Sequence, residues 1–249
     1  MKLKRLITSI VAMIFLTVSS VFAQGLPSHS ELQKVLKSVQ AEKNGGFSLH
    51  MWATVVNRDG VVKAVVFTGN DRGDQWPGSR VISAQKANTA NAFGLPGLAL
   101  STANLFTATQ PGQSLYGLQH SNPINTDAAY GGDSNKIGMS NDPMVGKKIG
   151  GVNVFGGGLG LYNAQGKLIG AIGVSGDSST ADHNIAWKTR NALELDYVPS
   201  GVSASGDDNI VNDFKDGVSV GGWGHPSTTP EAAIIAAGFP KTHPVRRVK

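Results

Sequence analysis

The sequence predicts an α+β fold in which helices pack against one antiparallel sheet. Two similar hairpins are the main evidence, because apolar strand-like runs flank residues 57–60 (NRDG) and again flank residues 163–166 (NAQG). An alanine-rich helical stretch, residues 78–94, separates the hairpins, and its small side chains allow close approach to a sheet. Together these features predict four or five antiparallel strands in a single domain.

The first 23 residues have the pattern of a secretory signal peptide. Lys2, Lys4 and Arg5 precede an apolar run over residues 6–18, and small residues ending at Ala23 suit cleavage there. An uncleaved membrane anchor is the alternative, but the run is shorter than the roughly 20 residues that a bilayer span needs. We therefore expect an exported protein, periplasmic or secreted, that keeps no membrane attachment after cleavage.

Next along the chain, residues 28–43 are predicted to form a helix with an apolar stripe and Ser28 or Ser30 as its cap. The first hairpin follows, and then the alanine-rich helix. A second short helix is predicted over residues 98–112. Residues 110–151 are rich in Gly, Asn, Ser, Pro and Asp, and a structureless connection of that length is uncommon unless it is functional.

The second hairpin leads through a glycine-rich corner (GVSGDSST) into a last helix, residues 180–196. A glycine-rich, irregular extension begins at residue 199 and ends in PKTHPVRRVK, which we expect to be a solvated tail. The predicted organisation is therefore a signal peptide (1–23), one domain (24–198) and an extension (199–249).

Charge and composition exclude several classes of protein. The chain has no cysteine, which rules out disulfides, thiolate metal sites and Cys-x-x-Cys-His haem attachment. The net charge of +5 falls to +2 without the three basic residues of the signal peptide. It falls to −2 when the four basic residues from position 241 onward are also removed. Because the body of the protein is nearly neutral, we expect no nucleic-acid partner.

The glycine-rich corner does not match a known nucleotide or nucleophile motif. It lacks the Gly-x-Gly pair of a dinucleotide site and the Gly-Lys-Ser/Thr of a P-loop, and Asp177 replaces the last glycine of a nucleophile elbow. Ser175, Asp177 and His183 have no spacing that supports a triad. A helix start explains the corner better, with Ser179 or Thr180 as cap and Asp182 in the first turn.

The helix after the corner has two distinct faces. Ala181, Ile185 and Ala192 are expected on its core side. An imidazole, an indole and a guanidinium gather on roughly the opposite side, together with a carboxylate: His183, Trp187, Arg190 and Glu194. This second face is predicted either to be covered by a protein interface or by the C-terminal extension, or to form the wall of a site for a flat anionic molecule.

Two segments resemble a known family. The stretch NDRGDQWPGSRVISAQKANTANAF contains a Lys-Ala-x-Thr-Ala motif, and GGVNVFGGGLGLYNAQGKLIGAIGVSGDSSTADHNIAW contains Ile-Gly-Ala-Ile-Gly-Val-Ser-Gly. Together they resemble the GlcG/HbpS family of haem-binding proteins over residues 28–195. The resemblance implies a profilin-like fold with about five strands, haem as a cofactor, and usually a homo-oligomer. It carries over no iron ligand, because the family shares no single one.

Haem would need an axial ligand and cations for its propionates. Among the six histidines, His183 is the preferred iron ligand, while His50 has the alternative of a strand residue bonded to its neighbours. Arg72, Lys86 and Arg190 are candidates for propionates, with structural ion pairs as the alternative. Asp182 and Trp187 complete the predicted cofactor site, and Trp76 offers further flat apolar area.

Three functions are consistent with these observations. The first is an exported haem-binding protein that scavenges, buffers or senses haem. The second is an enzyme that degrades haem, or that performs acid–base chemistry on a small organic acid with Asp182 and His183. The third is an oligomeric scaffold without a ligand.

Overall fold

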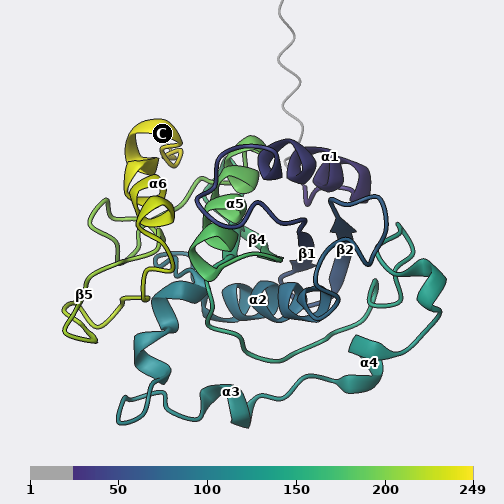
Figure 1. Ribbon diagram of the computed structural model, residues 1–249, viewed down its shortest axis with the longest axis horizontal. Coiled ribbons are helices and arrows are strands. Elements are labelled where there is room, and N and C mark those ends of the chain that lie inside the picture. Colours follow the sequence, from purple (N-terminus) through teal and green to yellow (C-terminus); the bar gives the residue numbers. More distant parts are fainter. Residues whose placement is uncertain (1–24, 249) are drawn as a thin grey trace, which may run out of the picture.

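The computed structural model describes residues 25–248, so the predicted signal peptide lies outside the described residues. Figure 1 shows how the helices and strands are arranged. In order they are α1 (His29–Gln40), β1 (Trp52–Asn57), β2 (Val62–Phe67), α2 (Ser79–Phe93), η1 (Thr102–Leu105), η2 (Thr107–Thr109), α3 (Leu118–Ser121), α4 (Thr126–Tyr130), η3 (Ser134–Lys136), β3 (Gly158–Tyr162), β4 (Leu168–Ser175), α5 (Ser179–Ala192), β5 (Phe214–Lys215), β6 (Val218–Ser219) and α6 (Pro230–Thr242).

The central sheet has the strand order β2-β1-β4-β3, and every neighbouring pair is antiparallel. The two hairpins join through the pairing of β1 with β4, in which Val55 lies opposite Ile172. Both hairpins therefore share one sheet, which confirms the predicted α+β fold. The sheet has four strands rather than about five, and the remaining pair, β5 with β6, forms a separate ribbon.

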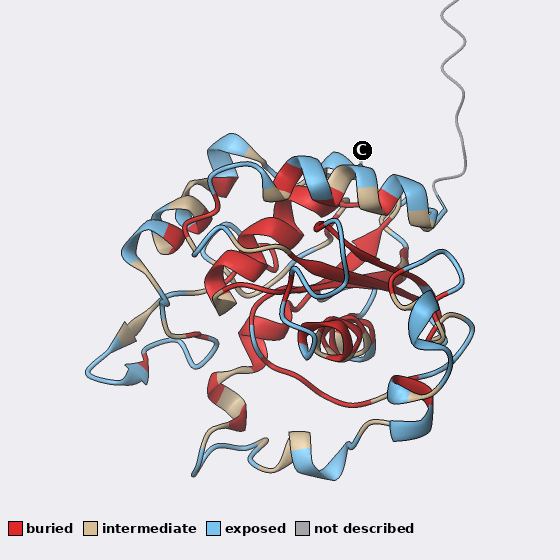
Figure 2. Cartoon of the chain, turned by 45° about the vertical axis from the view of Figure 1, so that its right-hand side comes forward, coloured by how far each residue is buried: buried red, intermediate tan, exposed pale blue. Residues whose placement is uncertain are grey.

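Helices cover both faces of the sheet. On one face lies α2, and on the other lie α1 and α5 (Figure 1). Because strand side chains alternate between the two faces, the sheet contributes side chains to two apolar cores. One core joins Val55 and Ile172 to α1 and α5, and the other joins Trp52 and Val65 to α2. The strands and the helix sides that face them are buried, whereas the outer sides of α1 and α6 are exposed (Figure 2).

Close contact between α2 and β4 explains one of the corner glycines. A Cβ atom at Gly173 would lie 2.0 Å from the carbonyl oxygen of Ser83 and 2.5 Å from the backbone nitrogen of Ala87. Only a residue without a side chain lets the alanine-rich helix pack this closely on the strand. The expected fit between small helix residues and the sheet is therefore seen at this position.

Several predicted element ends are confirmed or corrected. Ser28, one of the two predicted caps, caps α1, and it forms a capping box with Glu31. The short helix predicted over residues 98–112 is two 3₁₀ turns instead. Helix α5 ends at Ala192, earlier than predicted, because Leu193 caps it and Glu194 has a φ of 56°. Ala192 is exposed rather than on the core side.

The polar segment, residues 110–151, is ordered and contains α3, α4 and η3. Its anchor is a buried ion pair, in which the Arg80 guanidinium donates two hydrogen bonds to the Asp142 carboxylate at 2.9 and 2.5 Å. Asp142 also accepts the backbone N–H groups of Gly138 and Met144. One carboxylate thus holds the loop against α2.

The C-terminal extension folds back over α5. Phe239 of α6 stacks on Trp187 at 5.4 Å between ring centroids, and the Trp187 indole donates to the carbonyl of His243. The tail is not the solvated end that we expected: Arg246 pairs with Asp196 at 2.5 Å, and Arg247 donates to the carbonyl of Pro199. The tail guanidiniums therefore attach the end of the chain to the segment that follows α5.

Within residues 25–248, no helix combines the length and apolar character that a membrane span requires.

Candidate functional site

The face of α5 that was predicted as a ligand wall is interior packing in this structure. His183, Trp187 and Arg190 are all buried beneath the C-terminal extension. Covering by the C-terminal extension, one of the alternatives for this face, is therefore what the structure shows. None of the three lines either cavity described below.

Arg190 forms a buried ion pair rather than a free anion site. Its two terminal nitrogens donate to the two carboxylate oxygens of Asp208, each at 2.7 Å, and one also reaches the carbonyl of Gly160. Both side chains are fully buried. A bidentate guanidinium–carboxylate pair of this kind uses the donors that a propionate would need. The structural ion pair expected as the alternative for Arg190 is therefore the arrangement observed.

Neither ring nitrogen of His183 is accessible to a ligand in this structure. Its Nε2 atom accepts the backbone N–H of Ile210 at 3.1 Å and lies 3.2 Å from Oδ1 of Asn209, while Nδ1 is buried without a partner. Burial lowers the pKa of His183 to about 3, so the ring is neutral at physiological pH. Iron binding by His183 would require these contacts with the extension to break.

The other predicted residues lie in three separate places. Asp182 pairs with Lys86 of α2 at 2.7 Å, whereas His183 contacts Asn209 and Ile210, so the predicted acid–base pair of Asp182 and His183 is not formed. His50 lies two residues before β1 and is half-buried, with Nδ1 3.1 Å from the Thr68 hydroxyl, so it is bonded to a neighbour, as in the alternative, but is not itself a strand residue. Arg72 is exposed on the turn after β2.

The Lys86–Asp182 pair lines a cavity of about 280 Å³ between α2 and the glycine-rich corner, which we call the Lys86 cavity. Burial lowers the pKa of Lys86 and raises that of Asp182 to about 6, and the attraction between the two charges opposes both shifts. Lys86 also donates to the carbonyl of Val174. The remaining lining residues are Trp76, Ser79, Ile82, Phe155, Ser175, Asp177 and Ser179.

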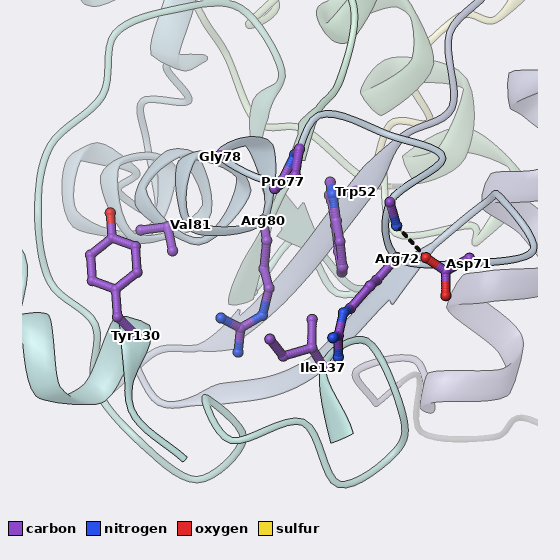
Figure 3. A pocket seen from close by; sticks show the side chains of 10 residues that line it. Trp52, Asp71, Arg72, Pro77, Gly78, Arg80, Val81, Tyr130 and Ile137 are labelled. Atoms are coloured by element: carbon purple, nitrogen blue, oxygen red, sulfur yellow. Dashed lines mark hydrogen bonds between the residues drawn. The ribbon is translucent and has the colours of Figure 1, made fainter. Parts of the chain in front are cut away.

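A larger cavity of about 410 Å³ lies on the other side of the α2 N-terminus, and we call it the Trp52 cavity (Figure 3). Its lining combines the start of β1, the turn after β2, the first turn of α2 and the polar segment. Most of these side chains are apolar or aromatic, with two arginines among them. The residues are Trp52, Asp71, Arg72, Gly73, Pro77, Gly78, Arg80, Val81, Tyr130 and Ile137.

The two arginines of the Trp52 cavity differ in what they can bind. Arg80 is committed to Asp142 and to the carbonyl of Ala129, so its charge is already balanced. Arg72 is exposed and donates to the backbone carbonyl of Ser134, which leaves its positive charge uncompensated by a carboxylate in that contact. The turn that carries Arg72 is held by Asp71, whose carboxylate accepts the N–H of Gly73 at 2.8 Å (Figure 3).

Comparison with known proteins now identifies the family. A family model described as "Haem degrading protein HbpS-like" matches residues 28–190, which is more than half of the chain. The chain belongs to this family. The match confirms the resemblance seen in the two sequence motifs, and it supports haem as the cofactor of this HbpS-like chain.

Two solved structures resemble the HbpS-like chain. The Klebsiella pneumoniae protein ORFY, of the family called DUF336, is 24% identical with a TM-score of 0.45, over 66% of this chain and 86% of its own. A PduOC structure solved as a haem complex is 23% identical with a TM-score of 0.47, over 68% of this chain and 94% of its own. Among the curated proteins compared, none matches.

The residues of the Trp52 cavity fit haem in three respects. Its volume lies within the range of roughly 300–1,000 Å³ typical of small-molecule sites. The indole N–H of Trp52, a lining residue, is buried without a hydrogen-bond partner, so it is a donor that no other group of the described protein satisfies. Tyr130 is the one lining residue whose type ligates haem iron.

Sequence reasoning placed Arg72 at a haem site but missed Trp52 and Tyr130. Trp52 reads as an ordinary strand residue, and its unpartnered N–H appears only in three dimensions. Tyr130 lies in the polar segment that the sequence marked as unusually long. That length was the available signal, although it did not point to one residue.

Proposed function

We propose that this HbpS-like protein binds haem in the Trp52 cavity. The observation that carries the proposal is the combination of apolar walls with the exposed guanidinium of Arg72 and the orphaned N–H of Trp52. A porphyrin needs a flat apolar surround, and its two propionates favour a cation at the edge. The Lys86 cavity is smaller, and its cation is already paired with Asp182.

Tyr130 and Arg72 would then hold the cofactor from the two sides contributed by the polar segment and by the turn after β2. Tyr130 is 67% exposed, so its hydroxyl is accessible to a ligand. Arg72 would donate to a propionate. When bound, haem supplies redox chemistry through its iron, and the family description includes degradation of haem.

Titration of the purified protein with haem, followed by the Soret band, tests the proposal. Tyr130→Phe keeps the aromatic ring but removes the candidate ligand, so we expect a shifted Soret maximum. Arg72→Ala removes a charge-assisted hydrogen bond, so we expect a dissociation constant that is roughly tenfold higher. Tyr116→Phe is the matched control, because Tyr116 is 64% exposed and does not line the cavity.

The same titration separates this proposal from the ligand predicted by sequence. If His183 binds iron, His183→Gln shifts the Soret maximum and Tyr130→Phe leaves it unchanged. That result, or unchanged spectra and affinity in both cavity variants, contradicts binding in the Trp52 cavity. Loss of the Soret band after addition of a reductant would distinguish degradation from scavenging, buffering or sensing.

We also propose that the protein acts outside the cytoplasm. The support is the basic start followed by an apolar run and the small residues before position 24. The exported protein would then begin at Gln24. An intact mass that retains Met1 in the exported fraction contradicts this.

A further inference from the structure

Ser179 and His225 form a hydrogen-bonded pair at the Lys86 cavity. The Ser179 Oγ atom lies 2.9 Å from Nε2 of His225, and Ser179 lines the cavity at the first turn of α5. His225 comes from the C-terminal extension and is only 3% exposed. The pair is therefore assembled from segments 46 residues apart.

The hydrogen bonds around His225 determine which nitrogen carries the proton. Its Nδ1 atom lies 2.7 Å from the carbonyl oxygen of Pro226, and because a carbonyl can only accept, Nδ1 must donate. Burial lowers the pKa of His225 to about 4, so the ring is neutral near pH 7. Nε2 then accepts, and the Ser179 hydroxyl donates to it. The ring of Phe106, 4.7 Å away, packs against the imidazole.

This arrangement has the three parts of an activated nucleophile: a hydroxyl, a base within hydrogen-bond distance, and a group that orients the base. Backbone N–H groups lie nearby. Gly156 donates its N–H to Ser179 Oγ at 2.7 Å. Ser179 and Thr180 begin α5, where N–H groups have no acceptor within the helix, and the cap residue Ser178 makes no side-chain cap hydrogen bond.

We infer that Ser179 and His225 are a nucleophile–base dyad that cleaves carboxylic esters with a short apolar acyl group. Trp76, Ile82 and Phe155 supply apolar walls for the acyl group, and the cavity volume of about 280 Å³ limits its length. The buried imidazole is a weak base, so esters with a good leaving group are the favoured class.

The reaction balances without a further reagent. Ser179 Oγ forms a bond to the carbonyl carbon, its proton passes to His225 Nε2, and the ester C–O bond breaks. The leaving alcohol takes the proton from His225. Water then attacks the acyl carbon and returns a proton through His225 to Ser179 Oγ, which releases the carboxylic acid. The free N–H groups at the start of α5 would stabilise the oxyanion in both steps.

An alkyl fluorophosphonate tests the dyad on the purified, folded protein. The phosphorus should bond to Ser179 Oγ with loss of fluoride, and peptide mass mapping should place one adduct on Ser179. His225→Gln should slow labelling at least about tenfold, since a positioned general base contributes about 10²-fold or more. Hydrolysis of p-nitrophenyl acetate should fall in parallel.

Ser178→Ala is the matched control, because Ser178 is the adjacent serine and its hydroxyl contacts Thr228 at 3.3 Å rather than a histidine. Its labelling rate should stay within about twofold of the unchanged protein. Absence of an adduct, an adduct at another residue, or equal labelling of His225→Gln overturns the inference. Mapping on the unchanged protein identifies the nucleophile even where a variant does not fold. Heat-unfolded protein should not be labelled, and this control shows whether labelling requires the fold.

Discussion

At the scale of single residues, the interior of this protein contains polar groups whose protonation is tied to folding. His183 is fully buried and keeps a neutral ring in the folded state because burial lowers its pKa to about 3. In the unfolded chain the ring takes up a proton below its ordinary pKa of 6.5. The stability that His183 contributes is therefore complete above pH 6.5 and is lost as the pH falls toward 3.

We predict that this histidine makes the free energy of unfolding fall at acidic pH. Between pH 6.5 and 5, one such histidine should cost roughly 2 kcal/mol, at about 1.4 kcal/mol per pH unit. Asp182, whose pKa is raised to about 6, has the opposite effect: its protonation in the folded state raises the free energy of unfolding as the pH falls below 6. The test therefore compares how much the free energy of unfolding falls between pH 7 and 5. Measured by urea unfolding, this fall should be smaller in His183→Gln than in the unchanged protein.

His120→Gln is the control for the pH measurement, because His120 is exposed in the polar segment. It should keep the full loss between pH 7 and 5. An identical pH slope in His183→Gln and in the unchanged protein would contradict the assignment of a buried neutral ring to His183.

At the scale of secondary-structure elements, α6 packs directly against α5. Phe239 is fully buried and stacks on Trp187 with an interplanar angle of 4°. We predict that Phe239→Ala lowers the free energy of unfolding by about 3–5 kcal/mol, because it removes a core aromatic ring. Lys241→Ala on the same helix should change it by less than about 0.5 kcal/mol, since Lys241 is exposed. Urea denaturation followed by circular dichroism compares the two, and equal losses would contradict the packing role of α6.

The elements that the sequence predicted well are those whose signals are local. Each hairpin has its turn residues between two apolar runs, and Ser28, one of the two predicted caps of α1, directly precedes that helix. The covering of α5 depends on a distant segment, because Trp187 bonds to a residue 56 positions later. A helix face that carries a histidine, a tryptophan and an arginine has the same sequence pattern whether a ligand or another helix covers it. The sequence therefore left both possibilities open.

The candidate site was harder to predict for the same reason. The Trp52 cavity is built from four separate segments, and Arg72 is the one lining residue that its motif context singled out. Tyr130 reaches the cavity because Arg80 and Asp142 hold the polar segment in place, and that ion pair spans 62 residues. No spacing of residues in a single sequence predicts a contact between such distant positions.

At the scale of the whole molecule, we predict a homo-oligomer. The apolar stretch EAAIIAAGF now forms α6, and Ile234 on its outer side is 71% exposed. Apolar groups that stay exposed on a monomer tend to be covered by association. Sedimentation velocity at micromolar concentration should give a mass above that of one chain, and Ile234→Lys should reduce it. A monomer as the single species would contradict the prediction.

The closure of the C-terminal extension over α5 also affects the order in which the chain is made. Trp187 leaves the ribosome 56 residues before His243, to which its indole is bonded in the finished fold. At 5–20 residues per second, synthesis of that interval takes roughly 3–11 s. Throughout this time the aromatic and charged face of α5 has no cover. The nascent chain therefore keeps that face exposed until α6 has been synthesised, and this part of the core is completed only then.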